Sequence, residues 1–294
     1  MKNILITGAN SYIGTSVEKW LLKEPNKYHI ETLDMKDENW KSFDFSKFDV
    51  VFHVAGIAHV SNDKKLDDLY YKVNRDLAIE TALKAKDSKV KQFIFMSSMI
   101  IYGKDNKIGD FRAVDKENYK PTSAYGKSKL EADLRIQELN DDSFKISIIR
   151  TPVVYGPGAK GNFPRLQKLA LKLPIIPEID NKRSMIYIDN LVNFIKLLID
   201  QEQQGVFYPQ NSEYVSTYEV MRLTRIMNNK KVRSTKIFNW LIKLGAIFIP
   251  TINKVYGNKY YELNNDEVGY RTRKFHETVR KTNDYFRGIW DMKI

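Results

Sequence analysis

The sequence of 294 residues predicts an α/β protein with a doubly wound parallel sheet and a smaller mixed domain in its C-terminal part. Three observations predict this fold class. Short apolar segments rich in β-branched residues alternate with longer segments of helical periodicity. A turn with two glycines follows the first apolar segment directly, and no internal repeat interrupts the alternation. Such alternation builds βαβ units, whose strands run parallel and whose helices cover both faces of the sheet.

Five strands and three helices are expected in the first half of the chain. A helix with apolar positions at Val17, Trp20 and Leu21 follows the first strand, and longer helices are expected over 69–86 and 123–139. We expect the sheet domain to span 1–155, with late elements around 184–212, and a second domain to comprise 156–183 and 213–294. The five expected strands are KNILIT (2–7), HIETLD (29–34), DVVFHVAG (49–56), QFIFMSS (92–98) and KISIIRTPVV (145–154).

The composition is that of an ordinary soluble globular protein, with 43% apolar and 29% charged residues. No tract approaches the roughly 20 apolar residues of a membrane-spanning helix, so no integral membrane segment is expected. The absence of cysteine excludes disulfide frameworks, thiolate metal sites and cysteine nucleophiles. We expect no metal site and a cytoplasmic protein, because the short start MKNILITG does not form a signal-peptide core.

The net charge of +12 is compatible with nucleic acid, anionic lipid or phosphorylated small molecules as partners. The lysines are scattered along the chain and do not gather in one arm or on one DNA-reading helix. A solvated basic surface is therefore favoured, and no nucleic-acid partner is expected.

TGANSYIG, residues 7–14, has the context of a phosphate-binding turn, since it lies between an expected strand and an expected helix. Glycines at both ends permit a tight turn and close packing of the helix on the sheet, and the helix N-terminus favours an anionic pyrophosphate. Serine stands where a third glycine is usual, and its small side chain leaves room for the pyrophosphate. The candidate residues of this turn are Gly8, Asn10, Ser11, Tyr12, Ile13 and Gly14.

Asp34 ends the second expected strand, 20 residues after Gly14. A carboxylate there accepts hydrogen bonds from an adenosine ribose and repels a 2′-phosphate, which favours NAD(H) over NADP(H). Lys36, close by, keeps NADP(H) as an alternative. Ala55 and Gly56, at the end of the third strand, complete the candidate dinucleotide-binding residues.

Tyr125 and Lys129 are four residues apart on the helix expected over 123–139, so their side chains project from one face. An ammonium group and a bound nicotinamide cation both favour the phenolate and would lower the pKa of Tyr125. Ser98 ends the fourth strand, where its hydroxyl can bind the same reacting oxygen. Together these three residues are candidates for proton exchange with a sugar hydroxyl or carbonyl.

The ordered set of TGANSYIG, Asp34, HVAG, FMSSMIIYG, YGKSK, RTPVVYGPG and RSMIYIDN resembles the extended short-chain dehydrogenase/reductase family of nucleotide-sugar epimerases and dehydratases. The resemblance implies a Rossmann domain, a small substrate domain, bound NAD(H) or NADP(H), and a UDP- or dTDP-sugar substrate. It makes Tyr125 the acid/base, Lys129 the ribose-binding residue and Ser98 the third catalytic residue. It also implies that Arg183 contacts the sugar-nucleotide phosphates, that Asn162 contacts substrate, and that the protein is a homodimer.

Departures from the family pattern narrow the expected chemistry. Ser98 is followed by Met99 and Ile100 where dehydratases carry an Asp-Glu pair, so 4,6-dehydration is not expected. Val153 replaces a frequent substrate-facing Asn, and Ala58 stands where galactose-type 4-epimerases often have a lysine. The next residue, His59, makes the arrangement similar to bacterial surface-polysaccharide enzymes that reduce a 4-keto sugar; a packed core histidine is the equal alternative.

Two enzyme hypotheses follow, together with one alternative without catalysis. A 4-ketoreductase, slightly favoured, takes hydride from an exchangeable nicotinamide, whereas a 4-epimerase retains NAD, oxidises C4 and returns hydride to the opposite face. A dinucleotide-sensing protein without activity is a remote alternative, because it has no need of the Ser98, Tyr125 and Lys129 set.

FNWLIKLGAIFIP, residues 238–250, is an apolar run too short to span a bilayer. We expect it to form a packed helix of the substrate domain. Weak contact with a membrane surface is the alternative.

Overall fold

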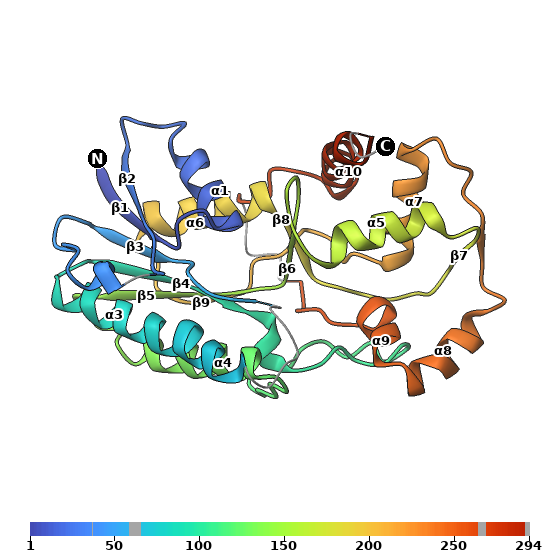
Figure 1. Cartoon of the computed structure of the whole chain (residues 1–294), viewed down its shortest axis with the longest axis horizontal. Helices are drawn as coiled ribbons and strands as arrows, with labels where there is room; N and C mark the ends of the chain where they lie inside the picture. Colours follow the sequence, from blue (N-terminus) through green and yellow to red (C-terminus); the bar gives the residue numbers. More distant parts are fainter. Residues whose placement is uncertain (37, 59–65, 264–268, 292–294) are drawn as a thin grey trace. The chain divides into compact units, whose positions relative to one another are not determined.

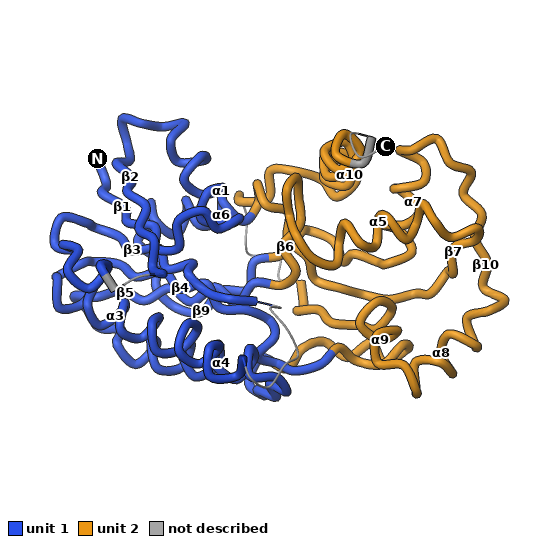
Figure 2. The backbone as a smooth tube through the Cα atoms, viewed as in Figure 1, with its two compact units in different colours: residues 1–104, 116–151, 191–209 blue, residues 105–115, 152–190, 210–294 orange. Residues whose placement is uncertain are grey.

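The computed structural model describes residues 1–36, 38–58, 66–263 and 269–291. The chain forms two compact units (Figure 2). Unit 1 comprises residues 1–104, 116–151 and 191–209, and unit 2 comprises residues 105–115, 152–190 and 210–294.

Unit 1 contains a six-stranded sheet in which all neighbouring strands run parallel, in the order β2-β1-β3-β4-β5-β9. Because β1 lies between β2 and β3, the chain adds strands in opposite directions on its two sides. This arrangement is the topological switch point at which open α/β sheets bind ligands, outside the carboxyl ends of the strands. The strands are β1 (Lys2–Thr7), β2 (Tyr28–Leu33), β3 (Val50–His53), β4 (Gln92–Ser98), β5 (Lys145–Thr151) and β9 (Gly205–Phe207).

Helices cover both faces of this sheet, which confirms the predicted doubly wound α/β fold. Figure 1 shows α1 (Tyr12–Leu21) and α6 (Ile188–Gln201) on one face, and α3 (Leu77–Asp87) and α4 (Ala124–Gln137) on the other. The helix expected over 69–86 is divided into α2 (Asp67–Tyr71), a π-helical turn η3 (Lys72–Asp76) and α3. Two short 3-10 helices follow β2 and β4, namely η1 (Glu38–Lys41) and η4 (Met99–Tyr102).

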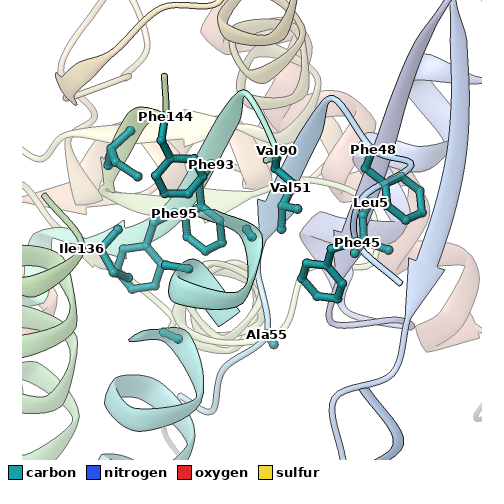
Figure 3. Packing of buried hydrophobic residues seen from close by; sticks show 14 of the residues in the cluster. Leu5, Phe45, Phe48, Val51, Ala55, Val90, Phe93, Phe95, Ile136 and Phe144 are labelled. Atoms are coloured by element: carbon teal, nitrogen blue, oxygen red, sulfur yellow. The ribbon is translucent and has the colours of Figure 1, made fainter. Parts of the chain in front are cut away.

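One hydrophobic cluster of unit 1 lies between the sheet and the helices α3 and α4. Val17 and Leu21 of α1 and Leu191 and Ile195 of α6 are also fully buried. Figure 3 shows the rings of Phe93 and Phe95 from β4 packed near Phe144, and Phe45 and Phe48 gathered near Leu5 of β1. The strands read as nearly continuous apolar runs because a parallel sheet is buried on both faces. Each fully buried phenylalanine contributes about 1.5–3 kcal/mol relative to an exposed one.

Unit 2 contains two small parallel strand pairs and most of the later helices. One pair joins β6 (Val153–Tyr155) to β8 (Met185–Tyr187), and the other joins β7 (Ile176–Pro177) to β10 (Ser234–Thr235). The strand expected over 145–154 is thus divided, with its last residues in β6 of unit 2. The helices are α5 (Asn162–Lys172), α7 (Thr217–Met227), α8 (Asn239–Phe248), α9 (Pro250–Tyr256) and α10 (Phe275–Asp291).

Residues 105–115 belong to unit 2, although the sequence pattern places them in the sheet domain expected over 1–155. The backbone explains this difference. Asn106 and Asn258 form a bridge in which the Asn106 amide donates to the Asn258 carbonyl at 2.8 Å, and Val114 donates to the carbonyl of Tyr260 at 2.8 Å. The segment is therefore held by a distant part of the chain that local patterns do not reveal.

The expectation of a packed helix over 238–250 was wrong in both length and burial. Two helices, α8 and α9, meet here, and Pro250 opens the second of them. Most large apolar side chains of α8 are exposed; Ala246 is buried, and Asn239, Ile242 and Gly245 are partly buried. Among the described residues, no helix has the length and apolar character that crossing a membrane requires.

Candidate active site

The turn between β1 and α1 holds the end of β1 against the end of β3. Gly8 has a φ of 102°, and a Cβ atom there would lie 2.7 Å from the backbone nitrogen of Ala55. Only glycine satisfies both the positive φ and this close approach. Asn10 also has a positive φ, 63°, which asparagine tolerates better than most residues. The turn thus lies at the switch point of the sheet.

Ser11 is the N-cap of α1, and its conformation explains why glycine is dispensable there. Its φ of −74° and ψ of 148° are those of extended backbone, which any residue adopts. Its Oγ accepts a hydrogen bond from the Gly14 amide at 3.1 Å, as a capping side chain does. Tyr12 and Ile13 form the first turn of the helix, where the backbone amides and the helix dipole favour an anion.

Asp34 follows β2 and is exposed. Its Oδ1 accepts a hydrogen bond from the Lys36 amide at 3.1 Å, and the Lys36 Nζ lies 3.8 Å from Oδ2. Asp34 and Lys36 therefore lie side by side, so the carboxylate that favours a ribose and the cation that favours a 2′-phosphate share one location.

Ser98 and Tyr125 interact through their side chains. Ser98 is the last residue of β4 and the N-cap of η4, where its Oγ accepts from the Ile100 amide at 3.3 Å. Tyr125 lies in the first turn of α4, which Ser123 caps. Burial raises the pKa of Tyr125, and the hydrogen bond with Ser98 opposes this shift. The pKa of Tyr125 is therefore raised and not lowered in the protein itself, and Lys129 is not among the causes of the shift.

Lys129 lies one turn after Tyr125 and is buried. Its Nζ donates to the carbonyl of Met96 at 2.9 Å and lies 4.7 Å from the centre of the Phe95 ring. Burial lowers the pKa of Lys129 to about 8, with the Asp133 carboxylate opposing the shift. The ammonium group is thus fixed to the strand that also carries Ser98.

Asn74 fixes the segment after β3, a role that the sequence analysis missed. It is fully buried in the π-helical turn, where its Oδ1 accepts from the Ile57 amide at 2.9 Å and its Nδ2 donates to the Ile57 carbonyl at 3.0 Å. A Cβ on Gly56 would lie 3.0 Å from Asn74 Oδ1 and 3.4 Å from Lys129 Nζ. The sequence signal for this role was a polar residue on the apolar side of the expected helix. Asn74 lies in a π-helical turn, and such turns are frequent at functional sites.

A buried ion pair was also missed. Asp133 continues the series that begins with Tyr125 and Lys129, each four residues from the next, and its carboxylate pairs with Arg150 of β5. The guanidinium also donates to the hydroxyls of Tyr102 and Tyr208 at 2.8 and 3.2 Å. An arginine inside the apolar strand KISIIRT was the available signal, because a buried arginine requires an acidic partner.

The remaining candidates fall in unit 2 or outside the described residues. Asn162 is exposed and begins α5. Arg183 is largely buried, with Nη2 2.9 Å from Asp105 Oδ2 and Nη1 donating to the Gly257 carbonyl at 3.0 Å. His59 lies outside the described residues. In the parts of the chain that the structure describes, no cluster of three or more His, Cys, Asp or Glu residues offers a metal site.

The family model described as "NAD dependent epimerase/dehydratase family" matches residues 4–208, which include the turn after β1 and the Ser98, Tyr125 and Lys129 set. The chain belongs to this family. The predicted resemblance to nucleotide-sugar epimerases and dehydratases is thereby confirmed, and the chain is an enzyme of that class.

Two relatives of this family member are named as 4-epimerases. A UDP-glucose 4-epimerase of Vibrio cholerae is 35% identical over 273 residues, covering 84% of this chain and 82% of the relative. An N-acetyl-alpha-D-glucosaminyl-diphospho-ditrans,octacis-undecaprenol 4-epimerase of Escherichia coli O157:H7 is 26% identical over 277 residues, covering 88% of this chain and 82% of the relative.

The fold of this family member agrees with solved structures of epimerases. The structure of a UDP-glucuronic acid 4-epimerase from Bacillus cereus in complex with NAD superposes with a TM-score of 0.74, at 20% identity, and covers 98% of this chain and 99% of the other. The likeness confirms the expected fold.

Proposed function

We propose that the chain is an NAD-dependent 4-epimerase that acts on a UDP-hexose. The observation that carries the proposal is the interaction of Ser98 with Tyr125 beside the buried Lys129, in a chain 35% identical to a UDP-glucose 4-epimerase. The sequence slightly favoured a 4-ketoreductase, partly because of His59, and this preference stays a prediction. The two relatives named as 4-epimerases support the epimerase.

We propose that unit 1 binds NAD(H). The fit rests on Gly8, whose missing side chain lets β1 and β3 approach, and on Gly56, where a side chain would meet Asn74 and Lys129. The amides of the first turn of α1 suit a pyrophosphate, and Asp34 suits a ribose. NAD accepts and returns the hydride of the sugar carbon when it is bound.

The residues of this chain would manage the proton. Tyr125 removes the proton of the sugar hydroxyl as that carbon is oxidised, and returns a proton when the carbonyl is reduced from the other face. The Ser98 hydroxyl, which interacts with the Tyr125 side chain through a hydrogen bond, orients the sugar oxygen. Lys129 supplies positive charge and a ribose contact from its fixed position on the Met96 carbonyl.

We propose that unit 2 binds the sugar nucleotide. Asn162, at the exposed start of α5, is suited to hydrogen bonds with the sugar. Arg183 is suited to the diphosphate because its guanidinium carries several N–H donors in a fixed geometry. In this structure those donors bind the Asp105 carboxylate and the Gly257 carbonyl. Nearby, burial lowers the pKa of Lys259 to about 8, with Asp105 opposing the shift, so this cation also gains from an added negative charge.

Cofactor retention and turnover together test the proposal. The purified protein is denatured, and the released dinucleotide is identified by mass spectrometry; we expect NAD. The native protein is then incubated with UDP-glucose or UDP-N-acetylglucosamine without added cofactor, and the C4 epimer is followed by proton NMR. The Tyr125→Phe variant should retain dinucleotide and form no product.

Each other outcome would assign a different function to this protein. Turnover that requires added NADPH and a 4-keto sugar nucleotide would replace the epimerase by the reductase. Retained dinucleotide without turnover of either substrate would favour the sensing protein. Full activity of Tyr125→Phe would overturn the assigned acid/base. The homodimer and the cytoplasmic location stay predictions, and light scattering of the purified protein checks the former.

A further inference from the structure

Helix α8 presents a stripe of large apolar side chains to solvent. Leu241, Leu244 and Phe248 follow one another at intervals of three and four residues, so they share one face, and the exposed Ile237 precedes the helix. Trp240 and Ile247 widen this face. The exposed fractions reach 62% for Trp240, 72% for Ile247 and 77% for Phe248. We call this set the apolar stripe: Ile237, Trp240, Leu241, Leu244, Ile247 and Phe248.

The opposite side of α8 is the side that holds the helix in unit 2. Ala246 is buried, and its carbonyl accepts a hydrogen bond from Asn253 Nδ2 of α9 at 2.9 Å. Asn239 Nδ2 donates to the Glu178 carbonyl at 2.8 Å. A side chain on Gly245 would meet Ile252 of α9 at 3.2 Å. Small and polar groups and the partly buried Ile242 thus attach the helix, while most of its large apolar side chains are turned outward, opposite to a core-facing helix.

Basic residues predominate around the stripe, and the nearby Glu178 carboxylate pairs with one of them, Lys236, at 4.0 Å. The chain contains no Asp or Glu from Val220 to Tyr261. Exposed basic residues stand before, within and after α8, on both ends of the apolar stripe. They are Lys230, Lys231, Arg233, Lys236, Lys243 and Lys254.

We propose that the apolar stripe docks on the surface of a bilayer containing anionic phospholipid. A helix with a large apolar face and basic flanks lies in the plane of a membrane interface, with its apolar side chains among the lipids and its lysines at the headgroups. The ten residues of α8 span about 15 Å, which is half of a hydrocarbon core, so the helix lies on the bilayer and does not cross it.

The charge decides between the lipid and a second copy of this chain. A twofold contact between two stripes would bring the same basic residues together, and their repulsion opposes such a dimer. An anionic surface instead attracts all of them. Exposed apolar patches of this kind mark interaction sites. An anionic bilayer offers negative headgroups to the lysines and an apolar interior to the apolar stripe.

Vesicle sedimentation of the full chain tests this proposal. We expect binding to vesicles of phosphatidylglycerol mixed with phosphatidylcholine, and at least tenfold weaker binding to phosphatidylcholine alone. The double variant Trp240→Gln/Phe248→Gln should bind at least tenfold more weakly. Lys236→Gln/Lys243→Gln should weaken binding and reduce its dependence on salt.

The controls separate docking from general effects on the fold. Leu22→Gln and Leu83→Gln remove exposed apolar side chains of unit 1 and should leave vesicle binding unchanged. The melting temperature of every variant, followed by circular dichroism, should match that of the parent chain. Equal binding of the parent and of Trp240→Gln/Phe248→Gln would overturn the proposal. A second result would also overturn it: the parent chain does not bind vesicles but is a dimer by light scattering, and Trp240→Gln/Phe248→Gln is a monomer.

Discussion

Asp133 and Arg150 form a buried, bidentate ion pair between α4 and β5. Arg150 Nη2 lies 2.8 Å from Asp133 Oδ1, and Nε lies 3.0 Å from Oδ2. The side chains are 0% and 2% exposed, respectively. Ser97 of β4 also donates to Asp133 Oδ2. The helix that carries Tyr125 and Lys129 is therefore fastened to two strands of the sheet by one carboxylate.

Asp133→Asn should lower both stability and turnover. Removing one partner leaves the Arg150 charge buried without its counter-charge, which costs about 3–5 kcal/mol of unfolding free energy. The same change loosens α4 below Tyr125, so we expect kcat to fall more than the affinity for the dinucleotide. Urea unfolding and steady-state kinetics measure the two effects.

Glu131→Gln provides a matched control on the same helix. Glu131 pairs with Arg75 at 2.9 Å, but the two side chains are 47% and 34% exposed, so the loss should stay below about 1 kcal/mol. Equal destabilisation by the two changes would show that burial of the Asp133 pair is not what fixes the helix.

The sequence predicted the fold of unit 1 well because its signals are local. The bounds of β1 and β4 agree with the expected segments, since each is an apolar run ended by a turn or a cap. The placement of Tyr125 and Lys129 on one face follows from the geometry of a single helix. The pairing of Asp133 with Arg150 was out of reach, because it depends on the register that sets Ser97 opposite Arg150.

Helix α8 shows a different limit of sequence patterns. Its apolar residues repeat with helical periodicity, and such a pattern does not state whether the face meets a protein core or another environment. Contacts of Ala246, Gly245 and Asn239 determine which side of α8 faces unit 2. Small and polar residues of this kind do not reveal such contacts in a sequence. The same holds for residues 105–115, whose partners lie about 150 positions away.

Ser11→Gly should preserve NAD binding, and a bulky residue at this position should weaken it. The backbone at Ser11 is extended, so glycine relieves no strain there, and loss of the cap costs only a few tenths of a kcal/mol. Ser11→Leu removes the hydrogen bond to the Gly14 amide and crowds the helix N-terminus. Calorimetric titration with NAD, after removal of endogenous dinucleotide, measures both; equal affinity of Ser11→Leu and the parent would show that Ser11 does not face the pyrophosphate.

His53 should make the protein less stable as the pH falls below about 6.5. The imidazole is fully buried between Phe93 and Phe95 and shares a 2.8 Å hydrogen bond with Thr7. Burial lowers its pKa to about 3, with Lys129 adding to the shift. Between pH 6.5 and 3 the unfolded chain therefore binds more protons, and stability falls by up to about 1.4 kcal/mol per pH unit.

Urea unfolding at pH 7, 6 and 5 compares the parent with His53→Asn, which keeps a hydrogen-bonding group for Thr7. The carboxylates titrate alike in both proteins, so the difference between the two pH profiles isolates His53. We expect the variant to be less stable at pH 7 and to lose less stability on acidification. Parallel profiles would mean that His53 does not govern this pH range.

Asp34→Ala should shift the cofactor preference from NAD towards NADP, and Lys36 is the reason. In the parent chain the Asp34 carboxylate lies beside Lys36 and would repel a 2′-phosphate. Without the carboxylate the lysine is available to that phosphate, so we expect the ratio of the two affinities to change at least tenfold. The control, Lys36→Ala, keeps the carboxylate and should bind NADP no better than the parent does. Titrations of each variant with both dinucleotides give the ratio, and an unchanged ratio in Asp34→Ala would remove Asp34 from the ribose site and leave the cofactor choice to other residues of unit 1.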